Sequence, residues 1–149
     1  MTRQGGSGVA TTATADPVVK SAARWFWWIA GLSLVNLVLL HSGSNTNFVV
    51  GLAMTMLASG LFAGNPPVAL GLAALTIGFY LLVGFYAERQ RLWAFYLGLA
   101  LYLLDGLLYL YFQDWMPVAF HAFVAYCICR GILRMRALAR DAAAAPTAG

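Results

Sequence analysis

The chain has 149 residues, of which 62% are hydrophobic and only 9% are charged. An ordinary soluble domain is about 45–50% apolar and about 25% charged, so this composition excludes a water-soluble core and predicts that lipid surrounds most of the chain. The net charge of +4 comes mainly from Arg residues that flank apolar runs, which is typical of cytoplasmic membrane ends rather than of a face that binds nucleic acid.

Residues 1–19 and 141–149 are rich in small and polar residues without an apolar period, so we expect two disordered tails around a transmembrane helical domain at 20–140. Within this domain the apolar stretches are 22–41, 47–64, 67–87, 92–112 and 116–136. A helix needs about 20 residues to cross a bilayer. The sequence therefore predicts an all-α, polytopic membrane helical bundle.

The first stretch follows Lys20 and Arg24 and has some features of a cleaved signal peptide. Its start at Trp25-Phe26-Trp27-Trp28 and the long preceding tail are atypical of one, so we expect a retained helix. The second stretch is the weakest, because it contains several glycines and ends at Asn65-Pro66-Pro67, where one helix should stop and the next begin.

The distribution of the basic residues is consistent with two membrane topologies. Five crossings place the N-terminus outside and separate the first basic group, which is Arg3, Lys20 and Arg24, from all the others. Four crossings bring every Lys and Arg to the cytoplasmic side, and we favour this arrangement. It requires the second stretch to be a short re-entrant helix, with a sheltered groove near residues 43–47 and 64–67. In both topologies the C-terminus is cytoplasmic, and we expect the cell inner (plasma) membrane.

Asp105 is the strongest functional pointer, because an acid at the centre of a spanning helix costs roughly 2.5–3.5 kcal/mol. His121 lies at a similar distance from the turn at 113–115, on what should be the antiparallel neighbouring helix. Tyr102 and Tyr109 share the helical face of Asp105. The predicted polar intramembrane cluster comprises Asp105, His121, Asn36, Tyr102, Tyr109 and His41. It is either a hydrogen-bonded pair that fixes the helices or a site that titrates protons or binds a ligand.

Known catalytic and metal-binding spacings such as HExxH, CxxC and GxGxxG do not occur, so we expect no catalytic residue, metal or cofactor. Cys127 and Cys129 point apart on a helix and should not form a disulfide with each other. Small residues four apart, such as Ala74 and Gly78, permit close helix packing within one chain or across a dimer.

The runs WFWWIAGLSLVN (25–36), SG with FVVGL (42–52), LYLLDGLL (101–108) and FHAF with RG (120–131) are similar to those of an uncharacterised group of small bacterial multi-span integral membrane proteins. This resemblance implies a multi-span inner-membrane protein and no particular activity.

We therefore expect a non-enzymatic structural or accessory subunit that acts through helix–helix association, in a homo-oligomer or a larger membrane complex, with the lipid bilayer as its surroundings and no nucleic-acid partner. The alternative is an oligomeric translocator of a small solute, ion or proton that uses Asp105 and His121. A second alternative is an intramembrane enzyme or redox protein.

Overall fold

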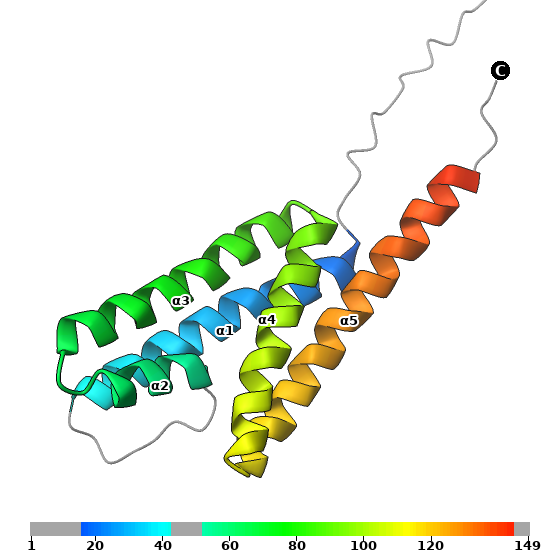
Figure 1. The fold of residues 1–149 in the computed structure, drawn as a ribbon. Coiled ribbons are helices and arrows are strands. Elements are labelled where there is room, and N and C mark those ends of the chain that lie inside the picture. Colours follow the sequence, from blue (N-terminus) through cyan, green and yellow to red (C-terminus); the bar gives the residue numbers. More distant parts are fainter. Residues whose placement is uncertain (1–15, 43–51, 145–149) are drawn as a thin grey trace, which may run out of the picture.

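The computed structural model describes residues 16–42 and 52–144, and these residues form five helices and no strand (Figure 1). In chain order the helices are α1 (Pro17–His41), α2 (Ala53–Leu61), α3 (Pro66–Glu88), α4 (Leu92–Tyr111) and α5 (Trp115–Ala144). The predicted all-α class is confirmed. The predictions for residues 1–15, 43–51 and 145–149 lie outside the described residues.

Two helices extend further than the predicted tails allowed. The helix α1 begins at Pro17, because the Asp16 side chain accepts a hydrogen bond from the Val18 amide (2.9 Å) and proline suits a first helical position. The helix α5 continues to Ala144, because the run ALARDAAA is rich in the best helix-forming residue. The predicted tails, 1–19 and 141–149, were therefore wrong for residues 17–19 and 141–144, which are helical.

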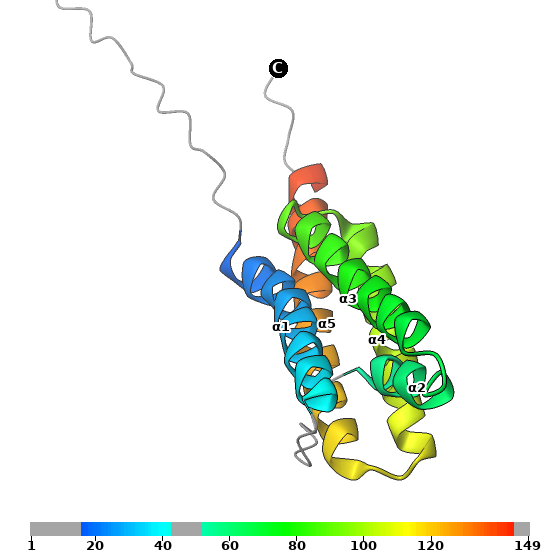
Figure 2. The same cartoon turned by 90° about the vertical axis from the view of Figure 1, so that its left-hand side faces the viewer.

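The long helices α1, α3, α4 and α5 are each long and apolar enough to cross a membrane. The helix α2 has nine residues, which is about 14 Å of helix against a hydrocarbon core of about 30 Å. It turns back through residues 62–65 and packs along α3 (Figures 1 and 2). By length and composition, the described residues therefore contain four helices that could cross a membrane and one helix that is too short to do so, which is the set that the four-crossing arrangement requires.

The helix α1 packs against α3 and α5, and α4 completes the bundle against α3 and α5. The close packing depends on glycines: a Cβ at Gly98 would collide with Phe26 and Val83, and a Cβ at Gly131 would collide with Ala22. The Phe26 ring meets the Phe95 ring edge-on, with centroids 5.8 Å apart. The apolar core runs along the bundle, from Val19 and Ala22 near the start of α1 to Leu37 and Leu52 beside α2.

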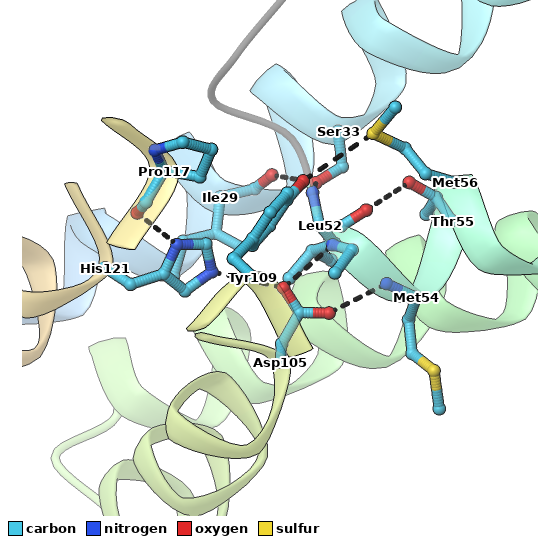
Figure 3. A network of polar contacts seen from close by, with 11 residues as sticks. Ile29, Ser33, Leu52, Met54, Thr55, Met56, Asp105, Tyr109, Pro117 and His121 are labelled. Carbon is cyan, nitrogen blue, oxygen red and sulfur yellow. Dashed lines mark hydrogen bonds and ion pairs between the residues drawn. The ribbon is translucent and has the colours of Figure 1, made fainter. Parts of the chain in front are cut away.

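The half of the bundle that contains the start of α1 carries every Lys and Arg of the described residues. They lie at the start of α1, in the turn between α3 and α4, and along the second half of α5, at positions Lys20, Arg24, Arg89, Arg91, Arg130, Arg134, Arg136 and Arg140. The opposite half contains α2, the turn between α4 and α5, and the polar cluster around Asp105 (Figures 1 and 3).

Candidate functional site: a polar cluster around Asp105

Asp105 of α4 caps the N-terminus of α2. The residue at the N-cap position, Leu52, has no side-chain oxygen and makes no capping bond. Instead the Asp105 carboxylate accepts hydrogen bonds from the Ala53 amide at Oδ2 and from the Met54 amide at Oδ1, both at 2.9 Å (Figure 3). An anionic acceptor is favourable there, because the first amides of a helix lack intrahelical partners and carry the positive end of its dipole.

His121 of α5 contacts the same carboxylate. Its Nε2 lies 3.1 Å from Asp105 Oδ2, and its Nδ1 lies 2.8 Å from the Pro117 carbonyl oxygen. Because a carbonyl only accepts, Nδ1 must carry a proton and donate it. The contact between Nε2 and Oδ2 then needs one further proton, held either by the imidazole or by the carboxyl group. In both cases the pair carries no net charge.

This neutral pairing explains how the acid is tolerated inside the bundle. Asp105 and His121 are each only 4% exposed. An isolated buried charge is costly, whereas a pair whose remaining lone pairs and protons are satisfied is much less so. Among the described residues, every buried side-chain nitrogen and oxygen atom has a hydrogen-bond partner.

Two tyrosines of α4 enclose the imidazole. The Tyr102 ring stacks on the His121 ring, with centroids 4.3 Å apart and planes at 14°, and the Tyr109 ring lies 5.3 Å away at 51°. The Tyr109 hydroxyl donates to Met56 Sδ of α2 at 3.7 Å. The tyrosines thus hold the imidazole by ring contact, and Tyr109 adds a contact between α4 and α2.

Ser33 of α1 fixes the residue that precedes α2. Its hydroxyl donates to the Ile29 carbonyl (2.7 Å) and accepts from the Leu52 amide (3.3 Å). The Thr55 hydroxyl donates to the Leu52 carbonyl (2.7 Å). Leu52 is therefore held through both of its peptide groups, and the cluster links four helices, α1, α2, α4 and α5.

The structure brings together most of the residues singled out from the sequence. Asp105, His121, Tyr102 and Tyr109 form one cluster. Asn36 is buried on α1, but no hydrogen bond among the described residues joins it to Asp105 or His121. The side chain of His41, the last residue of α1, lies outside the described part of the chain.

Sequence reasoning missed Ser33, the Pro117 carbonyl and the two backbone amides that Asp105 accepts from. No sequence signal pointed to these amides. The second apolar stretch begins at Asn47 after Asn45 and Thr46, residue types that suit an N-cap, whereas the described helix begins at Ala53 after Leu52.

Three grooves surround α2. One of about 390 Å³ lies between α3 and α4 and reaches Asp105 and Tyr80. A second, of about 370 Å³, is lined by Tyr109 and Asp114. The third, of about 400 Å³, is lined by Ala63 and Pro66, next to residues 64–67 of the predicted groove; the other part of that prediction, residues 43–47, lies outside the described residues. No group of three or more His, Cys, Asp or Glu side chains suited to a metal occurs in the described ranges.

No protein-family model, curated protein or solved structure matches this chain. Its function is therefore inferred from its own residues.

Proposed function

We propose that this protein is a small, non-enzymatic membrane protein that acts as a structural or accessory subunit, and that it self-associates through α3. The observation that supports this best is a stripe of small residues on the outer face of that helix. Gly71, Ala74 and Gly78 recur at helical spacing and are all exposed. A Cβ added at Gly71 or Gly78 would meet no atom within 4 Å.

The contrast with the internal glycines makes this stripe informative. Gly98 and Gly131 face Phe26 and Ala22, so the fold itself accounts for their lack of a side chain. The stripe on α3 has no such partner within the described chain. Small residues at this spacing let two helix backbones approach closely in lipid, where packing and hydrogen bonding drive association.

The polar cluster supports this role by fixing the other side of α3. The helix α2 packs along α3, and Asp105 and Ser33 hold the start of α2. The hydrogen bonds of the Asp105 carboxylate are directed to groups within the chain. We therefore assign the cluster a structural role, which leaves the outer face of α3 as the surface for a second copy or a larger membrane complex.

We place the basic half of the bundle, with the start of α1 and the end of α5, on the cytoplasmic side of a bacterial inner membrane. The clustering of Lys and Arg in that half supports this orientation through the positive-inside rule.

Replacing Gly71 and Gly78 together with Leu tests the association. Because a Cβ at either position meets no atom of the chain, the double substitution should leave the fold intact. The added side chains should keep two α3 helices apart. Gly31→Leu is the matched control, because Gly31 is also exposed and open but lies on α1 among large residues. Association is read from energy transfer between labelled copies in liposomes. The proposal expects the double variant to weaken dimerisation at least tenfold, which is about 1.4 kcal/mol. A monomeric wild type, or equal association in all three proteins, contradicts it.

The second candidate is proton translocation by an oligomer. Two observations favour it: a groove reaches Asp105 between α3 and α4, and the contact between Asp105 and His121 contains a proton that either residue can hold. A pH-sensitive dye inside liposomes tests this. Wild-type flux that Asp105→Asn abolishes in a folded protein supports translocation, and flux equal to that of empty liposomes excludes it.

A further inference from the structure

A groove at the basic end of the bundle has no part in the proposed association. It has a volume of about 300 Å³ and lies between the start of α1 and the middle of α5. Its lining includes Ser21 and Trp25 from α1 and Cys127 and Arg130 from α5. It is far along the bundle from the stripe on α3 and from Asp105, so a ligand there would be a separate property of the chain.

The groove presents an available cation. Arg134, one turn further along α5, donates from Nε to Asp16 Oδ2 at 2.8 Å, and this bond holds the pKa of Asp16 below its ordinary value. Arg130 is exposed, and no ion pair to it occurs among the described residues; its guanidinium lies 6.0 Å from the centroid of the Tyr126 ring. Lys20 and Arg24 are exposed on the same end of α1. An anion in the groove would therefore meet the Arg130 guanidinium, while Lys20 and Arg24, which do not line the groove, add positive charge at the same end of α1.

An aromatic wall continues from the groove toward the membrane centre. The Trp25 ring meets Phe123 edge-on with centroids 5.5 Å apart, and Phe120 at 6.4 Å. The surface between α1 and α5 thus changes from cationic and polar at Arg130 and Ser21 to aromatic one to two turns deeper. A ligand that matches this gradient has an anionic head and an apolar chain.

We infer that this groove binds an anionic phospholipid, with its phosphate at Arg130 and the Ser21 hydroxyl and an acyl chain along Trp25 and Phe123. Guanidinium and hydroxyl donors suit phosphate oxygens, and basic pockets between membrane helices bind anionic head groups on the cytoplasmic side. The excess of positive charge favours a lipid with net negative charge over a zwitterionic one.

Binding is measured by native mass spectrometry of the full chain in detergent, titrated with phosphatidylglycerol. We expect Arg130→Ala to weaken binding at least fivefold. Arg140→Ala removes the same charge from an exposed position nearer the end of α5 and should change it less than twofold. Cys127→Trp keeps every charge but fills the groove, so it should also weaken binding at least fivefold. It tests the same groove without removing Arg130, so the inference does not depend on the folding of the Arg130 variant alone.

Three results would overturn the inference. Equal losses in the Arg130 and Arg140 variants would show diffuse charge attraction rather than a site. Equal binding of phosphatidylcholine would remove the selectivity for an anionic lipid. Competition by millimolar inorganic phosphate would identify a site for free phosphate.

Discussion

Replacing Asp105 should release α2 from the bundle. In Asp105→Ala the amides of Ala53 and Met54 lose their acceptor and His121 loses its partner. Removing one member of a buried, hydrogen-bonded pair costs about 3–5 kcal/mol. Asp105→Asn should cost less, about 1.5–3 kcal/mol, the value of one hydrogen bond to a charged group. The asparagine oxygen can accept from only one of the two amides, and its NH₂ group then faces the other.

These losses of stabilising free energy predict how much faster a buried position on α2 becomes accessible to a labelling reagent. We place a reporter cysteine at Ala58, which is buried on α2 at 8% exposure, in a background with Cys127→Ser and Cys129→Ser. If labelling requires α2 to detach, each 1.4 kcal/mol raises its rate about tenfold. We therefore expect an increase of about tenfold to a hundredfold in Asp105→Asn, and of more than about a hundredfold in Asp105→Ala.

The control is Asp114→Asn, which changes an exposed acid in the turn between α4 and α5. It should leave the labelling rate unchanged. If Asp105→Ala labels no faster than this control while both proteins stay folded, the carboxylate does not hold α2 and the structural role of the cluster is wrong.

Three further predictions concern other contacts. Ser33→Ala leaves the Leu52 amide without its acceptor and should lower the free energy of unfolding by about 1–3 kcal/mol, measured by unfolding in mixed micelles; a change below about 0.5 kcal/mol would show that this bond is dispensable. Gly98→Ala forces a methyl group against Phe26 and Val83 and should cost about 1–3 kcal/mol in the same assay, whereas Gly31→Ala should cost nothing; equal stability of the two variants would contradict the close contact of Gly98 with these two side chains. The pKa of Asp16 lies below its ordinary value of 3.8 because Arg134 donates a hydrogen bond to it. The contact between the two side chains therefore stabilises the fold at pH values above 3.8, and this stabilisation is lost as the pH falls through the lowered pKa. Asp16→Asn should therefore reduce the difference in melting temperature between pH 7 and pH 3, and an unchanged difference would exclude this contribution.

The contact between Asp105 and His121 was predictable because it depends only on regular geometry. Both residues lie on helices with a rise of about 1.5 Å per residue, joined by a short turn, so similar distances from the turn give similar depths. The positions of Tyr102 and Tyr109 follow from the same helical period.

The bonds from Asp105 to α2 were not predictable in this way. They depend on whether the second apolar stretch crosses the membrane or folds back, and its glycines and hydropathy fit both outcomes. The hydrogen bond from the Leu52 amide to Ser33 was not predictable either. A serine within a helix ordinarily donates to a carbonyl of the same helix, as Ser33 also does to Ile29, and this gives no sign of a second partner. Tertiary contacts across the bundle decide both.

The side of the membrane on which each turn lies tests the folded-back second segment most directly. Single cysteines at Ser44, Asn65, Gln90 and Gln113, in the background without Cys127 and Cys129, are labelled in intact cells with a reagent that does not cross the membrane. We predict that Ser44, Asn65 and Gln113 label from outside and that Gln90 labels only after the membrane is opened. Labelling of Ser44 and Asn65 from opposite sides would show that the second segment crosses the membrane, and would contradict the four-crossing bundle held by Asp105.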